Sequence, residues 1–357
     1  MVAEVWTKSR TNSKGERPVI ETVAALKEVL AEPSDALVAA MAALEGDLII
    51  LGAGGKMGLS LAHLAANAVS RSGVHRRVTA VSRFSAPGVE RDLRAAGVET
   101  IAADLLDDEQ LRALPDAPNV VYMAGTKFGT HGNEALTWAM NAYLPGRVAE
   151  KYRRARIVSF STGNVYPLVD LATGGATEEH PTGPVGDYAQ SCLGRERVFD
   201  YFAQRYDILL LHLRLNYAID LRYGVLLDVA QAVWEGRPID LRMGAANVIW
   251  QGDANALALR CLALCASPSR RLNVTGPETA SVRALALRFG ALLGREPAFT
   301  GEEQATALLS NASQAHQLFG YPRVPLGQMI EWTAHWVRIG GATLAKPTQF
   351  AQREGLF

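Results

Sequence analysis

The sequence predicts an α/β fold, in which a doubly wound parallel sheet is followed by a smaller, helix-rich C-terminal lobe. Short apolar runs alternate with helical patterns from Leu48 to Leu213. Repeated strand–helix–strand units of this kind build a parallel sheet with helices on both faces. After Arg214 the alternation gives way to longer helical patterns. The chain has 357 residues, of which 48% are hydrophobic and 20% charged, so it can bury a sizeable core.

Residues 1–46 read as an N-terminal helical extension. Their start is polar, and residues 19–30 and 34–44 then show two short helical patterns, the second with Ser34 as N-cap. We expect both helices to pack on the outside of a nucleotide-binding domain at residues 47–215. The smaller lobe and tail then occupy residues 216–357, interleaved in space with that domain.

The strands and helices follow from apolar runs and helical periodicity. Strands are expected at residues 48–51, 78–82, 98–102, 120–123, 157–160 and 209–213. In the lobe, helices are expected at 225–234, 254–265, 280–293, 303–318 and 326–337, with short strands near 239–241 and 248–250. The tail at 340–357 shows no clear periodicity, so we expect it to pack on a neighbour or fray.

Composition excludes several classes of partner. Lys and Arg total 36, as do Asp and Glu, so charge gives no reason to expect nucleic acid or an anionic membrane. No apolar run approaches the roughly 20 residues of a membrane span, and the N-terminus lacks a secretory signal. The three cysteines, Cys192, Cys261 and Cys265, argue against a disulfide framework and for a cytoplasmic protein. Cys261 and Cys265 share a helix face and favour core packing over metal binding.

A glycine-rich turn follows the first strand, in the sequence GAGGKMG at residues 52–58. A buried strand, a tight turn and a helix N-terminus in this order form a phosphate-binding site. Gly52 permits the turn, Gly55 allows the backbone to approach a pyrophosphate, and Gly58 lets the helix pack close to the strand. Gly54, Lys56 and Met57 complete the predicted cofactor contacts of this turn.

Further motifs occur in order along the chain, and together with the turn they resemble the extended short-chain dehydrogenase/reductase family of NAD-dependent epimerases and dehydratases. The resemblance spans about residues 48–338 and implies a Rossmann-like domain. Its landmarks are GxxGxxG at 52–58, Asp104 with Leu105 on the adenine side, Ala124-Gly125 along the cofactor, Asn141, the SSxxVYG-like 161–166, Tyr188 and Asp253. The turn alone also resembles dihydrodipicolinate reductases, whose later motifs are not found here.

The helix that normally carries YxxxK departs from the family pattern. It reads Tyr188-Ala-Gln-Ser-Cys192, so Tyr188 and Cys192 share a face four residues apart. In the family the lysine binds the nicotinamide ribose, and its charge lowers the tyrosine pKa. A phenol ionises near pH 10, and a thiol never carries a positive charge. Cys192 therefore cannot do the work of the lysine.

Three explanations stay open. Another cation can substitute, and Lys127 is favoured because it follows the fourth strand, at the edge of the sheet where ligands bind. Arg195, two turns after Tyr188, is expected on the surface or between the lobes. Alternatively, the reaction does not need an activated tyrosine, as in ketone reduction, where a neutral phenol already carries the proton. Finally, the chain can bind a dinucleotide without hydride transfer.

The resemblance gives the remaining site residues their roles. Thr162 would hydrogen-bond the reacting oxygen and Tyr188 would exchange its proton, with Ser161 supporting them. Asn141 would order a water or a backbone kink. At the end of the second strand the chain has Ser82 and Arg83, which suit a 2′-phosphate and favour NADP over NAD. The alternative is that Arg83 only covers the adenine ring.

The substrate is expected between the sheet edge and the smaller lobe. Family analogy suggests a sugar-like compound, and the partial match of 213–220 to RpxNvyGP fits a polyol or sugar acid at least as well as a nucleotide sugar. The candidate contacts are His131, Asn164, Tyr166, Asn216, Tyr217, Arg222 and Trp250.

The resulting prediction is an NAD(P)-dependent oxidoreductase or epimerase acting on a secondary alcohol or ketone of a sugar-like or sugar-acid substrate. By analogy it is a homodimer. The alternative is a dinucleotide-binding regulatory or assembly module without turnover. The cysteine at position 192 favours the module, whereas Thr162 and Tyr188, both in register, favour the enzyme.

Overall fold

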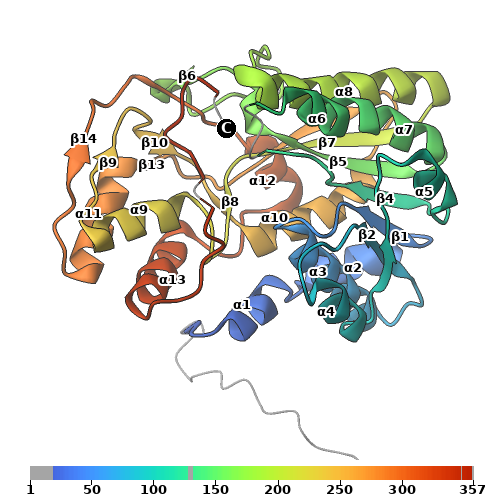
Figure 1. The fold of residues 1–357 in the computed structure, drawn as a ribbon, viewed down its shortest axis with the longest axis horizontal. Coiled ribbons are helices and arrows are strands. Elements are labelled where there is room, and N and C mark those ends of the chain that lie inside the picture. Colours follow the sequence, from blue (N-terminus) through green and yellow to red (C-terminus); the bar gives the residue numbers. More distant parts are fainter. Residues whose placement is uncertain (1–18, 128–131, 347, 356–357) are drawn as a thin grey trace, which may run out of the picture.

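A seven-stranded parallel sheet forms the centre of the molecule (Figure 1). The computed structural model describes residues 19–127, 132–346 and 348–355. The strand order is β12-β7-β5-β4-β1-β2-β3, which reverses direction between β1 and β4, where open α/β sheets bind ligands. The strands are β1 (Leu48–Leu51), β2 (Val78–Ser82), β3 (Glu99–Ala102), β4 (Asn119–Tyr122), β5 (Arg156–Thr162), β7 (Leu209–Leu215) and β12 (Arg270–Val274). The predicted α/β class is confirmed.

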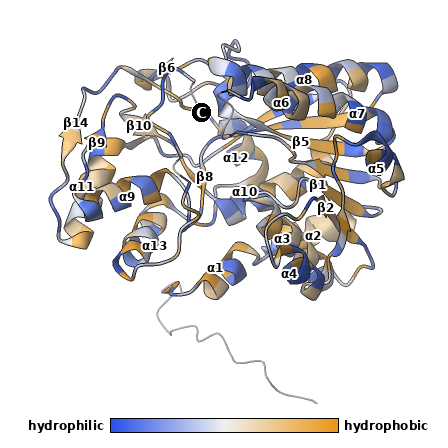
Figure 2. Ribbon diagram, in the orientation of Figure 1, coloured by the Kyte–Doolittle hydropathy of each residue, from blue (hydrophilic) through white to orange (hydrophobic). Residues whose placement is uncertain are grey.

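Helices cover both faces of this sheet. Successive residues of β1 point to opposite faces, so Leu48 and Ile50 join one hydrophobic cluster and Ile49 and Leu51 join another. The first face carries α2 (Asp35–Ala43), α3 (Gly58–Ser72) and α10 (Gln251–Arg260). The second carries α5 (Asp108–Ala113), α7 (Leu144–Lys151) and α8 (Gly186–Tyr206). In Figure 2 the central strands are largely in the hydrophobic colour.

Further short elements lie in this domain or between it and the smaller lobe. Ser34 caps α2 as predicted, because its hydroxyl accepts a hydrogen bond from the Leu37 backbone N–H. The others are α1 (Val23–Leu30), α4 (Val89–Ala95), α6 (Glu134–Trp138), the π-helical turn η1 (Ala139–Tyr143), the 3₁₀ turns η2 (Gly163–Val165), η3 (Leu171–Thr173) and η4 (Cys261–Leu264), and the short strands β6 (Val169–Asp170) and β8 (Ala218–Ile219).

The smaller lobe packs three helices around its own hydrophobic cluster. They are α9 (Val225–Glu235), α11 (Val282–Leu293) and α13 (Leu326–Arg338). Around them lie β9 (Ile239–Asp240), β10 (Ala245–Ala246), β11 (Ile249–Trp250), β13 (Ala280–Ser281), β14 (Phe299–Thr300), β15 (Thr306–Ala307) and α12 (Ser313–Phe319). None of the helices in the described part of the chain is long and apolar enough to span a bilayer.

Two expectations about elements are corrected. The seventh strand, β12, was missed because it begins with two arginines rather than an apolar run. Residues 303–318, expected as one helix, contain β15 and α12 instead. Because β12 pairs with β7 and α10 packs on α3, the chain returns to the large sheet after residue 215.

The C-terminal tail packs on its own chain. After α13 it passes the loop before α9, where the Leu344 N–H donates to the Arg222 carbonyl. The Thr348 hydroxyl and N–H both donate to the Asp228 carboxylate on α9. Its last described residues lie beside the start of α8, where a side chain on Gly186 would collide with Gly355. Figure 1 shows this segment crossing from α13 towards β6 and α8.

Candidate active site

The glycine turn is built by close packing between backbones. Gly52 has φ +92°, and a Cβ there would lie 2.6 Å from the Ala124 backbone nitrogen. A Cβ on Gly58 would lie 2.5 Å from the Ala53 carbonyl oxygen. Both contacts exclude any larger residue, so β1, the loop after β4 and the start of α3 meet without side chains between them.

The same turn leaves room for a phosphate. A Cβ on Gly54 would collide with the Ser82 hydroxyl, whereas a Cβ on the exposed Gly55 would meet only the Gly52 carbonyl oxygen, at 3.4 Å. The backbone N–H groups of Lys56 and Met57 donate to no acceptor within the described part of the chain. They lie at the N-terminus of α3, where free N–H groups and the helix dipole attract anions. The turn therefore fits the pyrophosphate of a dinucleotide.

The side chain of Lys56 extends away from the turn towards the smaller lobe. Its ammonium group lies 3.5 Å from the centroid of the Tyr223 ring. Burial lowers the pKa of Lys56 to about 7, and the positive charges of Lys127 and Arg222 lower it further, against Asp220 and Asp228. The turn thus carries a cation that faces the smaller lobe, on the side where the substrate is expected.

The far end of the predicted dinucleotide site lies after β2 and β3. The Arg83 guanidinium is 71% exposed and lies 3.9 Å from the Asp104 carboxylate. That carboxylate also accepts a hydrogen bond from the Leu106 N–H. The side chain of Leu105 is buried in the hydrophobic core, which leaves its backbone to make the expected cofactor contact.

Tyr188 lies in the first turn of α8 and meets Thr162, the last residue of β5. Its hydroxyl hydrogen-bonds the Thr162 and Cys192 side chains. The Thr162 hydroxyl also exchanges hydrogen bonds with Asn164, at 3.1 and 3.2 Å. Burial raises the pKa of Tyr188, and the neighbouring Cys192 raises it further. The phenol is therefore protonated at neutral pH.

Lys127 brings a positive charge to this tyrosine. Its ammonium group lies 5.7 Å from the centroid of the Tyr188 ring, within the range of a cation–π contact. Burial lowers the pKa of Lys127 to about 8, against the charges of Cys192 and Asp228. The residue favoured from sequence as a substitute cation is thus next to Tyr188.

The Asn141 side chain is fully buried and bonds only to other parts of the protein. It lies in the π-helical turn η1, which is a backbone kink of the kind expected there. Its side-chain amide donates to the Thr126 carbonyl and the Ser191 hydroxyl, and its oxygen accepts from the Thr126 N–H and Arg195. Asn141 therefore ties the loop carrying Lys127 to α8.

Arg195 corrects an expectation. Sequence reasoning placed it on the surface or between the lobes, but its side chain is buried beneath the start of α8. Its guanidinium donates to the Phe160 carbonyl at 2.6 Å and to the Asn141 side chain at 2.9 Å. The signal was available, because a seven-residue spacing returns to the helix face of Tyr188.

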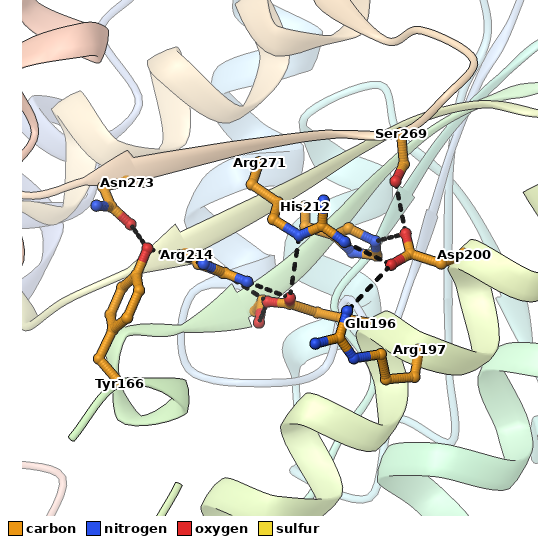
Figure 3. Close-up of polar contacts among 10 residues, drawn as sticks. Tyr166, Glu196, Arg197, Asp200, His212, Arg214, Ser269, Arg271 and Asn273 are labelled. Carbon is orange, nitrogen blue, oxygen red and sulfur yellow. Dashed lines mark hydrogen bonds and ion pairs between the residues drawn. The ribbon is translucent and has the colours of Figure 1, made fainter. Parts of the chain in front are cut away.

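A buried ionic network lies behind the site (Figure 3). Glu196 of α8 accepts two hydrogen bonds from Arg214, at 2.9 and 2.7 Å, and one from Ser161 at 2.6 Å. Arg214 also donates to the Tyr166 hydroxyl, which donates to Asn273. Ser161, which precedes Thr162 on β5, thus joins this network. Tyr166 is buried and fully bonded, so its predicted contact with substrate is corrected.

The network continues one turn along α8 at Asp200. This carboxylate accepts hydrogen bonds from His212, Arg271 and Ser269. Burial alone would raise the pKa of Asp200, but these hydrogen bonds and the charges of His212 and Arg271 hold it at about 2. Together the two carboxylates fix α8 to β5, β7 and β12.

The other predicted substrate contacts divide into two groups. Asn216 is buried and donates to Asn247, and Trp250 is 1% exposed and packs on Trp332, so both serve the core and their predicted role is corrected. Asn164 touches Thr162, and Arg222 forms an ion pair of 2.6 Å with Asp220 near Lys56. Tyr217 has φ +41°, a strained backbone next to these residues. His131 lies outside the described residues.

A cavity of about 360 Å³ lies in the smaller lobe beside these residues. It is lined by α9, the start of β9 and the C-terminal tail, and its lining includes Arg222 and Asp228. Sequence reasoning missed the part played by the tail, which has no periodicity to reveal it. Within the described ranges, no group of three or more His, Cys, Asp or Glu side chains is arranged to hold a metal ion.

A known family model covers the part of the chain that carries the glycine turn, Thr162 and Tyr188. Residues 48–219 match the model of the family described as NAD dependent epimerase/dehydratase family. None of the curated proteins matches the sequence.

Solved structures extend the likeness to the smaller lobe. The enzyme WbmG of Bordetella bronchiseptica, solved in complex with NAD, is 18% identical, with a TM-score of 0.68 over 86% of this chain and 98% of that one. The Thermus thermophilus UDP-glucose 4-epimerase complex with NAD is 18% identical, with a TM-score of 0.67 over 83% and 100% of the chains. The Bacillus cereus UDP-glucuronic acid 4-epimerase in complex with NAD is 17% identical, with a TM-score of 0.66 over 82% and 98%. Residues 48–219 thus match the model of the NAD dependent epimerase/dehydratase family, and the described chain shares the fold of these three solved structures.

Proposed function

We propose that this protein transfers hydride between a nicotinamide dinucleotide and a secondary alcohol or ketone of a sugar-like substrate. The observation that carries the proposal is the hydrogen-bonded pair of Tyr188 and Thr162. Thr162 ends β5, which is separated from β1 and its glycine turn only by β4. A proton donor and a dinucleotide cradle therefore share one edge of the sheet. The family match of residues 48–219 supports the same chemistry.

The residues divide the work between binding and proton transfer. The glycine turn and the N-terminus of α3 would hold the pyrophosphate, and the bound dinucleotide supplies or accepts the hydride. Thr162 orients the reacting oxygen. Tyr188 gives that oxygen its proton, so that the phenolic O–H bond breaks as a hydroxyl forms on the substrate.

The environment of Tyr188 favours ketone reduction at neutral pH. Burial raises the pKa of Tyr188, so the phenol holds the proton that reduction requires. Oxidation of an alcohol, or an epimerisation that includes it, requires a phenolate. The ammonium of Lys127, 5.7 Å from the ring centroid, stabilises the phenolate that forms in either direction.

The preference for NADP rests on Ser82 and Arg83. A guanidinium pairs well with a 2′-phosphate, but Arg83 lies 3.9 Å from Asp104, whose carboxylate would repel that phosphate. The structures compared above were solved with NAD. Separate calorimetric titrations with NADPH and NADH decide between the two cofactors.

The charge of the crevice supports a substrate with an acidic group. Lys56 and Lys127 lie close enough that the charge of Lys127 lowers the pKa of Lys56, and burial lowers the pKa of each. An anion placed between them would restore their charge and offset that burial. Sugar acids fit this chemistry, and two of the compared structures are epimerases of UDP-sugars.

The test is a paired substitution on one helix. We expect Tyr188→Phe to abolish oxidation of NADPH or NADH by a panel of keto-sugars and keto-sugar acids while dinucleotide affinity stays unchanged. The control is Tyr201→Phe, at an exposed tyrosine further along α8, which should keep full activity. Full turnover by Tyr188→Phe would refute the proposal. Tight dinucleotide binding without turnover by the wild type would favour a binding module, the reading that Cys192 supports.

A further inference from the structure

The guanidinium of Arg195 is held in place entirely by neutral groups. It donates to the Phe160 carbonyl, to the side-chain oxygen of Asn141 at 2.9 Å and to the Asn141 carbonyl at 3.4 Å. The residue is only 6% exposed. A guanidinium does not lose its proton in proteins, so it is charged in this position.

This charge has no carboxylate at ion-pair distance among the residues that the structure describes. The adjacent Glu196 is held by Arg214 and Ser161. Burying a charge without an opposite partner is costly, and such a residue is a candidate for a functional role. The groups that feel the charge of Arg195 most strongly are Cys192, Tyr122 and Tyr188.

The loop after β4 leaves space for this side chain. A Cβ on Gly125 would lie 2.5 Å from a terminal nitrogen of Arg195 and 2.8 Å from the Asn141 side-chain oxygen. Gly125 therefore allows the guanidinium to approach the underside of the site. Sequence analysis assigned this glycine to the cofactor, and the contact with Arg195 gives it a second reason.

We propose that Arg195 is a positioning residue that supplies, from one turn further along α8, the permanent positive charge that Cys192 cannot provide. The inference rests on the proposed function, because Arg195 acts through Tyr188. When the Tyr188 hydroxyl gives its proton to the substrate oxygen, the negative charge left on the phenolate is stabilised by the guanidinium.

Arg195 and Lys127 differ in how their charge depends on pH. The pKa of Lys127 is about 8, so its charge disappears in mild alkali, whereas that of Arg195 persists. Phenolate formation is favoured at high pH, where only Arg195 still contributes. The two cations can therefore be separated by experiment.

The test measures the ionisation of residue 188 directly and needs no substrate. A polyfluorinated tyrosine incorporated at position 188 ionises at lower pH than tyrosine, and its ¹⁹F chemical shift reports the phenolate. A unit charge at about 10 Å with an effective dielectric of about 20 shifts a pKa by roughly one unit. We expect Arg195→Gln to raise the pKa of the fluorotyrosine by about that much and Arg195→Lys to raise it far less.

A matched control and a second route complete the design. Arg197→Gln removes an exposed arginine of the same helix, 59% exposed and 3.9 Å from Asp200, and should leave the ionisation unchanged. Cys192→Lys in the Arg195→Gln background should lower the pKa again by restoring a charge at the family position. If Arg195→Gln does not fold, Gly125→Ala displaces the guanidinium from the loop side and should raise the pKa.

The inference and the proposed function fail in different ways. Equal pKa values in wild type, Arg195→Gln and Arg195→Lys would overturn the role of Arg195 while leaving hydride transfer untouched. A shift in Arg197→Gln as large as in Arg195→Gln would also overturn it, because any helix charge would then suffice. Absence of dinucleotide binding would refute the proposed function without altering the ionisation result.

Discussion

Replacing Glu196 by glutamine is expected to destabilise the protein through the buried ionic network. The Glu196 side chain is inaccessible to solvent and binds Arg214 through two hydrogen bonds, with a third from Ser161. Arg271 lies 3.8 Å away. Glutamine keeps the size of the side chain but removes its charge, and its amide group would face guanidinium donors.

The magnitude follows from the loss of one partner of a buried pair. Arg214, 2% exposed, would remain charged without its counter-ion, and breaking such a pair costs about 3–5 kcal/mol. The free energy of unfolding, from urea denaturation followed by tryptophan fluorescence, measures it. The control is Glu150→Gln on α7, where an exposed carboxylate lies 3.8 Å from Arg147, and its cost should be below about 1 kcal/mol.

The effect should also depend on pH. Burial by itself would raise the pKa of Glu196, but the hydrogen bonds from Arg214 and Ser161 and nearby positive charges hold it below the usual value. A lowered carboxyl pKa stabilises the protein above the ordinary glutamate pKa, and this stabilisation is lost as the pH falls through the folded-state pKa. The difference between wild type and Glu196→Gln should therefore shrink in acid. A loss below about 1 kcal/mol at neutral pH would refute the reasoning.

Three other predictions concern the site and the tail. Lys127→Met should lower the rate of ketone reduction about tenfold, consistent with a partly buried cation–π contact. It should also remove the decline in wild-type activity that we expect above the Lys127 pKa of about 8, and Lys127→Arg should move that decline to higher pH. A pH profile identical to wild type in both variants would contradict this role of Lys127. Arg83→Ser should weaken NADPH binding by about 10- to 100-fold, which is the contribution of a charge-assisted hydrogen bond, and should leave NADH binding unchanged. Equal effects on both cofactors in calorimetry would argue against a 2′-phosphate contact. Thr348→Val removes one of the donors to the half-buried Asp228 carboxylate and should cost about 1–3 kcal/mol. It should also accelerate hydrogen exchange at residues 344–350; unchanged exchange would show that this bond does not hold the tail.

The parts of the fold that sequence predicted well are those fixed by local chemistry. The glycine turn could be predicted because Gly52 and Gly58 are required by backbone contacts within the same strand–turn–helix unit. The cap of α2 by Ser34 is equally local. Long apolar runs gave β1, β4 and β5 within two residues of their observed ends.

The parts that sequence missed depend on partners distant in the chain. β12 was missed because Arg271 looks solvent-facing until Asp200 and Glu196 are seen beside it. Arg195 looked like a surface residue because its acceptors come from β5 and η1.

Trp250 and Tyr166 were expected to contact the substrate because their motifs lie near predicted site residues in the sequence. Their side chains turn instead into the core and the ionic network. The path of the C-terminal tail could not be predicted, since it depends on hydrogen bonds of Thr348 and Arg353 to residues distant in the chain.

The central claim, hydride transfer with Tyr188 as proton donor, is tested most directly by following an isotope. The protein is incubated with a reduced dinucleotide deuterated at the hydride-donating carbon and with a panel of keto-sugars and keto-sugar acids, and the products are analysed by mass spectrometry. The account predicts a deuterated alcohol with the wild-type protein and none with Tyr188→Phe, although both bind the dinucleotide. Deuterated product from Tyr188→Phe at the wild-type rate, or no label from a wild-type protein that binds the dinucleotide, would contradict it.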